Sequence, residues 1–186
     1  MDARWDYSHT KGWIFGYKLH IVSSAGSSII VILSADVTTA NIPDNHFYPD
    51  LTLSGLHPEI IKKIHYMIAD PGYDDQSLYD LSMDLGFELI YPVRRYKNTL
   101  HKKDRKRLIF MIRHLNRRYT HKEKYIHRTT YRTHKIVFRI EPLPIKGHDK
   151  ASAIVLLSVL LYPILVYYNC KTERQKPRTI NYLIGY

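Results

Sequence analysis

Cysteine is nearly absent from this chain of 186 residues, in which Cys170 stands alone. A single cysteine excludes an internal disulfide framework and fits a reducing compartment. The first residues, MDARWDYSHTKGW, contain no apolar run, so the sequence predicts no signal peptide there. Acidic residues are also few, 17 against 28 Lys and Arg, which leaves a formal net charge of +11. We therefore expect a cytoplasmic protein whose partners carry negative charge.

The excess of basic residues is concentrated in one segment, residues 94–135. This segment holds 16 Lys or Arg and only two acids, Asp104 and Glu123. Polyanions such as DNA bind basic segments because each neutralised phosphate releases condensed counterions. A solvated loop or helix face is the alternative explanation for a run of like charge. We call residues 94–135 the basic insertion.

Hydrophobic patterning predicts a single α/β domain over residues 1–186. Apolar residues make up 45% of the chain, which is ordinary for a globular protein with a core. Two β-branched runs, FGYKLHIV and SIIVILSADV, are separated by the hairpin signal SSAGS. IHYMIA and FELIYPV predict two further strands, with helical segments in between. This alternation is typical of a sheet flanked by helices.

Individual residues indicate where these elements end and which faces they expose. Lys18 and His20 alternate with apolar residues, which predicts that one face of their strand is exposed. We expect Asp44 or Asn45 to cap the helix that follows TTANIP.

The segment DDQSLYDLSMDLG predicts a second helix with recognisable ends. Asp74 or Asp75 would cap its N-terminus and Gly86 would terminate it, with leucines along one side. Both acids therefore have a structural explanation that requires no chemistry.

Residues 151–170, ASAIVLLSVLLYPILVYYNC, contain no charged side chain. By length alone they are a transmembrane candidate. Pro163, Asn169 and two serines argue against a span, and no other such segment occurs in the chain. We therefore expect an apolar core helix packed on the sheet, and no membrane partner.

Asp70 follows the strand IHYMIA and begins the turn DPG. In open α/β sheets, reactive groups collect at the carboxyl ends of strands. A carboxylate there can bind Mg²⁺, which takes one or two carboxylates together with water and phosphate oxygens. A purely structural aspartate at the start of an Asp-Pro-Gly turn is the alternative, and the pattern alone leaves both open.

Four blocks of the sequence strongly resemble DDE-type transposases of insertion sequences, which have an RNase H-like catalytic domain. The blocks are DARWDYSHTKGWIFGYKLHIV, SADVTTANIPDN, ADPGYDDQSLYDL and EPLPIKGHDKASAIVLLSVLLYPILVYYN, in the family's order. The resemblance implies a mixed sheet flanked by helices, with Asp70 as a catalytic aspartate that binds Mg²⁺ or Mn²⁺. It also implies that the partner is DNA, at insertion-sequence ends whose phosphodiesters are cut and joined.

The sequence departs from the family pattern at its start. In the family the first catalytic aspartate lies on the first, central strand, upstream of the DARW block with which this chain begins. We therefore expect an N-terminally truncated domain that lacks this strand, with Asp2 and Asp6 in the following loop. The strands GYKLHIV and IHYMIAD would then pair directly or form a weakened sheet, because their ladder groups need partners.

A second departure concerns the family's third acid, a glutamate in a Tyr-Arg-Glu-Lys signature. If Lys135 is the signature lysine, Arg128 stands at the glutamate position, and Glu123 could serve only through a gap. Two metal ions need more than one carboxylate, and Arg128 would place a positive charge beside them. We therefore expect two of the three catalytic acids to be missing and catalysis to be impaired.

The sequence thus predicts a partial RNase H-like transposase domain that is nucleoid-associated in the cytoplasm. The main alternative is a catalytically dead DNA-binding or inhibitory fragment, as a homo-oligomer or with full-length transposase. A small basic membrane-anchored protein is a second alternative. The residues expected to contact DNA phosphates are Arg94, Arg95, Lys97, Arg117, Arg118 and Lys135.

Overall fold

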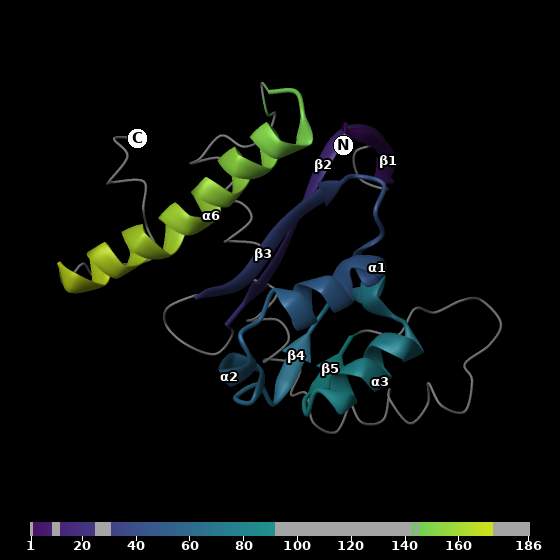
Figure 1. Cartoon of the computed structure of the whole chain (residues 1–186), viewed down its shortest axis with the longest axis vertical. Helices are drawn as coiled ribbons and strands as arrows, with labels where there is room; N and C mark the ends of the chain where they lie inside the picture. The colour runs from purple at the N-terminus through teal and green to yellow at the C-terminus, as the bar shows by residue number, and fades with distance from the viewer. Residues whose placement is uncertain (1, 9–11, 25–30, 92–142, 144, 173–186) are drawn as a thin grey trace. The chain divides into compact units, whose positions relative to one another are not determined.

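The computed structural model describes residues 2–8, 12–24, 31–91, 143 and 145–172. The chain divides into two compact units, residues 1–42 with 123–186 and residues 43–122. The first contains an antiparallel sheet and the second a parallel one, each with helices (Figure 1). This confirms the predicted mixed α/β fold class.

The sheet of the first unit has the order β1-β2-β3. Its strands are β1 (Arg4–Ser8), β2 (Gly12–Ser23) and β3 (Ile32–Thr39). The first part of β2 pairs with β1 and the second part pairs with β3, in both cases antiparallel. The predicted hairpin of β2 and β3 is confirmed. The placement of Asp6 in a loop is wrong, because this residue lies within β1 opposite Ile14.

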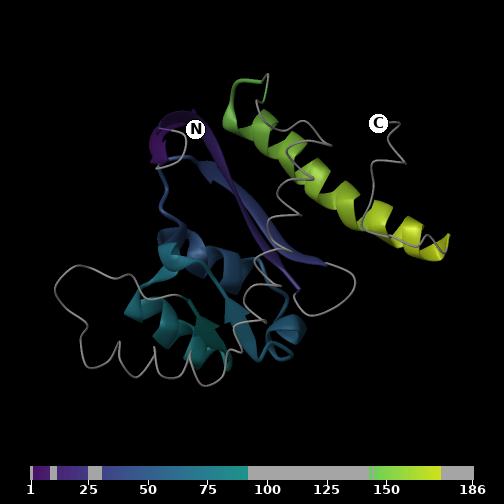
Figure 2. The ribbon, with the colours of Figure 1, turned by 180° about the vertical axis from the view of Figure 1, so that it is seen from behind.

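Helix α6 (His148–Lys171) runs alongside β3 in both views of the ribbon (Figures 1 and 2). At its start, His148 Nε2 is hydrogen-bonded to Val37 O (2.9 Å), and its ring lies edge-on to that of Tyr17. One side of the helix is buried, and the other side exposes large apolar residues. The buried residues are Ala151, Val155, Ser158, Val159, Tyr162, Val166 and Asn169.

Within the described residues, α6 is the one helix that is long and apolar enough to cross a membrane. Core helices of soluble proteins pass the same test, so this is weak evidence for a span. The helix includes residues 151–170, and it has one buried side, as a core helix does.

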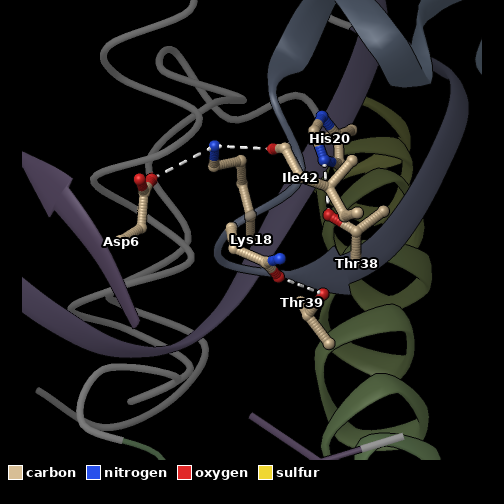
Figure 3. A network of polar contacts seen from close by, with 7 residues as sticks. Asp6, Lys18, His20, Thr38, Thr39 and Ile42 are labelled. Carbon is tan, nitrogen blue, oxygen red and sulfur yellow. Dashed lines mark hydrogen bonds and ion pairs between the residues drawn. The ribbon is translucent and has the colours of Figure 1, made fainter. Parts of the chain in front are cut away.

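The polar face of β2 is not exposed as the alternation of its residues predicts. His20 is only 3% exposed, and its Nε2 is hydrogen-bonded to Thr38 Oγ1 at 2.9 Å (Figure 3). Lys18 Nζ donates to the Ile42 carbonyl (2.9 Å) and lies 3.5 Å from Asp6 Oδ2. Because Thr38, Asp6 and the Ile42 carbonyl supply partners for these groups, they can leave water without losing hydrogen bonds.

The second unit is a parallel strand pair with short helices. Strands β4 and β5 are only three residues long, and Ala69 N–H extends their ladder by donating to Ile90 O (2.9 Å). The elements are α1 (Asp44–Pro49), a π-helical turn (Asp50–Ser54), α2 (Pro58–Ile61), β4 (Tyr66–Ile68), a 3₁₀ turn (Pro71–Tyr73), α3 (Gln76–Asp84) and β5 (Glu88–Ile90).

A small hydrophobic core holds the second unit together. Its buried members come from α1, α3 and the β5 region, and the Tyr48 hydroxyl is hydrogen-bonded to Ser82 Oγ at 2.7 Å. Ser82 Oγ also donates to Leu78 O, so both buried hydroxyls are satisfied. The buried apolar members are Tyr48, Leu78, Leu89 and Tyr91.

The helix ends in this unit match the sequence predictions only in part. Asp75 caps α3 and Gly86 follows it with a positive φ of 88°, as predicted. The prediction for α1 is wrong, because Pro43 occupies the cap position without a side-chain bond. Asp44 is instead the first helical residue, in the first turn of α1.

Of the two outcomes expected for the GYKLHIV and IHYMIAD strands, direct pairing is not found among the described strands. These segments lie in β2 and β4, which belong to different sheets. The physical reason is that β4 takes β5 as its partner and β2 takes β1 and β3.

Candidate functional site

The candidate site lies at the turn that follows β4. Ile68 is the last residue of the strand, and Asp70 follows immediately after the last ladder bond of Ala69. The Tyr73 N–H donates to Asp70 O (3.2 Å), which closes the 3₁₀ turn. The chain therefore turns sharply at the carboxyl end of a parallel strand, where Asp70 was predicted to lie.

The carboxylate of Asp70 is held by the backbone of its own turn. Its Oδ1 accepts a hydrogen bond from Gly72 N–H at 2.6 Å, and the residue is exposed. A Cβ at position 72 would lie only 2.7 Å from this oxygen, so a side chain there would displace it. Glycine thus lets the backbone fix one oxygen of Asp70 while the carboxyl group stays accessible.

A second carboxylate approaches the same glycine. Asp44 Oδ2 would lie 3.5 Å from a Cβ built on Gly72, close to where Asp70 Oδ1 also lies. Asp44 comes from the first residue of α1 and Asp70 from the end of β4, so the fold brings them together. The sequence predicts Asp44 only as a candidate helix cap, because no spacing in the sequence links it to Asp70.

The neighbouring Asp75 has a different role. Its Oδ1 accepts from Ser77 N (2.9 Å) and Ser77 Oγ (2.8 Å), and its Oδ2 accepts from Asn45 Nδ2 (3.4 Å). These bonds, chiefly the one from the Ser77 hydroxyl, lower the pKa of Asp75 because they stabilise its charged form. Both of its oxygens are thus engaged at the start of α3, as the structural explanation predicts.

The chemistry of the paired carboxylates fits one hard divalent cation. Mg²⁺ commonly takes one or two protein carboxylates and completes its shell with water and phosphate oxygens. Within the described ranges, no group of three or more His, Cys, Asp or Glu could hold a metal ion. Asp70 and Asp44 are the two described carboxylates that approach Gly72.

The other predicted site residues lie outside the described part of the chain. These comprise the whole basic insertion, including Arg128 and Glu123 at the family's third-acid signature. Their roles stay predictions. The residues concerned with DNA are Arg94, Arg95, Lys97, Arg117, Arg118 and Lys135.

Comparison with known proteins agrees with the resemblance seen in the sequence blocks. A family model described as Transposase DDE domain matches residues 1–181. No curated protein and no solved structure matches the chain. Because the match spans almost all of the 186 residues, it establishes the family. The chain belongs to the DDE-type transposases, a family whose general function is DNA transposition.

Proposed function

We propose that this chain acts in transposition as a DNA-binding transposase domain in which Asp70 is a metal ligand and catalysis is impaired. The observation that supports it best is the environment of Asp70. Its carboxylate is exposed at the carboxyl end of β4, held by Gly72 N–H and beside Asp44. This is the edge of a parallel sheet at which functional groups usually collect.

The residues that would hold Mg²⁺ or Mn²⁺ are Asp70 and, beside it, Asp44. When bound, such an ion stabilises the negative charge that develops on phosphodiester oxygens during cleavage and joining. The contribution of the chain is to fix one oxygen of Asp70 through the Gly72 N–H, so that the carboxylate needs little reordering on binding.

Impaired catalysis follows from the signature region of the sequence. An active site that clamps both the attacking and leaving oxygens uses two metal ions, which need further carboxylates. At the family's glutamate position this sequence has Arg128 when the signature is aligned on Lys135. A guanidinium there would repel a divalent cation instead of binding it.

DNA binding is proposed to come mainly from the basic insertion. Its 16 Lys and Arg residues would neutralise phosphates, with Arg94, Arg95 and Lys97 among them. Binding to duplex DNA should therefore fall steeply with salt, by about 10³-fold or more between 50 and 200 mM if six or more phosphates are contacted.

The first test compares Asp70→Asn with the parent chain on duplex DNA carrying an insertion-sequence end. Asparagine keeps the oxygen that accepts from Gly72 N–H and removes the charge, so the turn should remain intact. We expect Mn²⁺-dependent DNA cleavage, measured on a gel, to be weak in the parent and lost in Asp70→Asn. Asp80→Asn, an exposed carboxylate on α3, is the matched control and should behave like the parent.

Cleavage that persists in Asp70→Asn but disappears in Asp80→Asn would overturn the assignment of Asp70. If neither protein binds the duplex in an anisotropy assay at low salt, the proposed function itself is wrong.

The second test places a carboxylate at the signature glutamate position. Arg128→Glu should raise Mn²⁺-dependent cleavage well above that of the parent, because it adds a carboxylate at the signature position. The double variant Asp70→Asn with Arg128→Glu should again be inactive. An unchanged or lower rate in Arg128→Glu would show that Arg128 does not occupy the third-acid position.

A catalytically dead DNA-binding or inhibitory domain is the second candidate function, and Arg128 favours it. In that case duplex DNA binds with the expected salt dependence, while cleavage is absent in the parent and in Arg128→Glu. Adding the chain to a full-length transposase should then reduce the activity of that enzyme, either through shared DNA sites or through mixed oligomers.

We also propose that α6 is a core helix and not a membrane anchor. The supporting observation is its buried stripe, together with the hydrogen bond from His148 to Val37 of β3. The chain should then remain in the supernatant after ultracentrifugation of detergent-free lysate. Recovery only in the membrane fraction would contradict this.

A further inference from the structure

The hairpin of β1 and β2 presents four aromatic rings on one face. Trp5 lies opposite Phe15, with ring centroids 5.1 Å apart, and Tyr7 lies opposite Trp13 at 5.6 Å. Because side chains alternate between faces along a strand, all four rings share one face of this hairpin. We call these residues, Trp5, Tyr7, Trp13 and Phe15, the aromatic ladder.

The rings of the aromatic ladder are exposed despite their mutual contacts. Trp13 is 70% exposed, Trp5 60%, Phe15 56% and Tyr7 53%. Further along β2 the same alternation leads to Tyr17, whose ring packs on His148 of α6. One face of β2 is therefore covered where α6 begins and uncovered where the aromatic ladder lies.

The geometry within each pair keeps ring faces clear of the pair partner. The ring planes are inclined by 51° in the Trp5–Phe15 pair and by 71° in the Tyr7–Trp13 pair. In a tilted or edge-to-face pair, the ring that offers its edge keeps its own faces clear of its partner. A flat aromatic group can stack on such a face.

We propose that the aromatic ladder is a stacking surface for unpaired bases of single-stranded DNA. Base–aromatic stacking is tolerant of sequence because every base has a π-face, and each stacked base contributes appreciably to affinity. Bases in an intact duplex cannot use this surface, because their faces are already covered by neighbouring base pairs. The inference rests on the proposed function, in which the chain acts on DNA.

Charge supports a nucleic-acid occupant over an apolar protein surface. The hairpin sequence, residues 4–18, holds three basic residues against one acid, and strand alternation places its exposed Arg4 on the face away from the aromatic ladder. On the opposite face of the hairpin, Asp6 is paired with Lys18, so its negative charge is compensated there. A backbone of phosphates can therefore pass along this hairpin without meeting an uncompensated Asp6.

The sequence offers a built-in probe, because Trp5 and Trp13 are the two tryptophans of the chain. Stacking of a base on an indole ring quenches its fluorescence, so tryptophan fluorescence, excited selectively over the 16 tyrosines, reports on the aromatic ladder. The full chain is titrated with an oligothymidylate of about 16 nucleotides, which lies within the usual site size for such surfaces. In parallel, anisotropy of labelled single strand and labelled duplex measures total binding.

We expect strong quenching by the single strand and little by a duplex of equal length. Trp13→Leu, which keeps an apolar side chain but loses the ring, should weaken single-strand binding by about tenfold. Trp13→Phe keeps a ring and should lose less than about threefold. Tyr66→Leu removes a comparably exposed ring from β4 and serves as the matched control with unchanged affinity.

Equal affinities of Trp13→Leu and Trp13→Phe, or single-strand binding without any quenching, would overturn the inference and leave duplex binding by the basic insertion untouched. If the parent chain binds neither single-stranded nor duplex DNA, the proposed function is overturned as well. If Trp13→Leu fails to fold by circular dichroism, Phe15→Leu keeps both tryptophans and decides the question with the same readouts.

Discussion

In the first unit each strand pairs with its neighbour in the sequence, whereas in the second β4 pairs with β5 across the helix α3. Antiparallel hairpins need only a short turn, and parallel pairs need a crossover. The consequence is a difference in what each unit presents to a ligand. In the hairpin of β1 and β2, the accessible side chains lie along the strands. In the parallel pair, they lie in the turn at the carboxyl end of β4.

The side chains to which we assign functions follow this difference. In the first unit they are the rings of the aromatic ladder, which project from paired strands and need no loop. In the second unit they are Asp70 and Asp44, which approach the same glycine because a strand end and a helix start come together. An affinity for bases and an affinity for a metal ion can thus be altered separately.

The largest expected effect comes from removing the buried ring of α6 in the first unit. Tyr162 is 1% exposed, so Tyr162→Ala should lower the free energy of unfolding by about 3–5 kcal/mol through lost burial and a cavity. Urea unfolding followed by tryptophan fluorescence reports on this unit, which holds both tryptophans. Tyr167→Ala, an exposed ring on the same helix, should cost less than about 0.5 kcal/mol. Equal costs would mean that α6 does not pack as described.

A core deletion in the second unit should have the next largest effect. Leu89 on β5 is buried in the cluster with Tyr48 and Leu78, so Leu89→Ala should cost about 2–5 kcal/mol. This cluster lies entirely within residues 43–122, whereas both tryptophans lie in the first unit. In urea unfolding of Leu89→Ala, we therefore expect far-UV circular dichroism to change at a lower urea concentration than tryptophan fluorescence. Coincident transitions in Leu89→Ala would show that the two units unfold together.

The buried hydroxyl of Tyr48 gives a smaller and pH-dependent effect. At neutral pH, Tyr48→Phe should cost about 1 kcal/mol, because the hydrogen bond to Ser82 is lost. Burial raises the pKa of Tyr48 to about 12, whereas the unfolded chain has the usual value of about 10.

The neutral hydroxyl thus contributes fully below pH 10, and this contribution is lost as pH rises toward 12, by about 1 kcal/mol at pH 11. The difference in unfolding free energy between parent and Tyr48→Phe, measured by urea unfolding, should therefore be smaller at pH 11 than at pH 8. A gap that is the same at both pH values would contradict a buried, protonated Tyr48.

Local rules predicted much of this fold. The β2–β3 hairpin and the Asp75 cap depend on residues close together in the sequence, and both are confirmed. The position of Asp70 after a strand was also predictable, because the strand-like run IHYMIA ends there. In each case one short segment contains the whole signal.

Contacts between segments far apart in the sequence could not be predicted from it. His20 was assigned to an exposed face because alternation gives the side of a strand but not what that side contacts. The approach of Asp44 to Asp70 depends on how α1 packs near the end of β4, which no spacing encodes. Strand β1 was missed because its aromatic residues have no apolar core to face.

The smallest expected effect distinguishes the two aspartates at either end of the same turn. Asp75→Ala removes the cap of α3 and should cost about 1 kcal/mol, whereas Asp75→Asn keeps an acceptor for Ser77 N and should cost less. The lowered pKa of Asp75 means that its charge contributes stability above the unfolded pKa of about 3.9, and that this contribution is lost as pH falls. The difference in unfolding free energy between parent and Asp75→Asn should therefore shrink from pH 7 to pH 3.

Asp70→Asn should leave stability unchanged at pH 7 while removing metal-dependent cleavage, since its turn keeps the bond from Gly72. If Asp75→Asn abolished cleavage and Asp70→Asn destabilised the unit, the roles assigned to the two carboxylates would have to be exchanged.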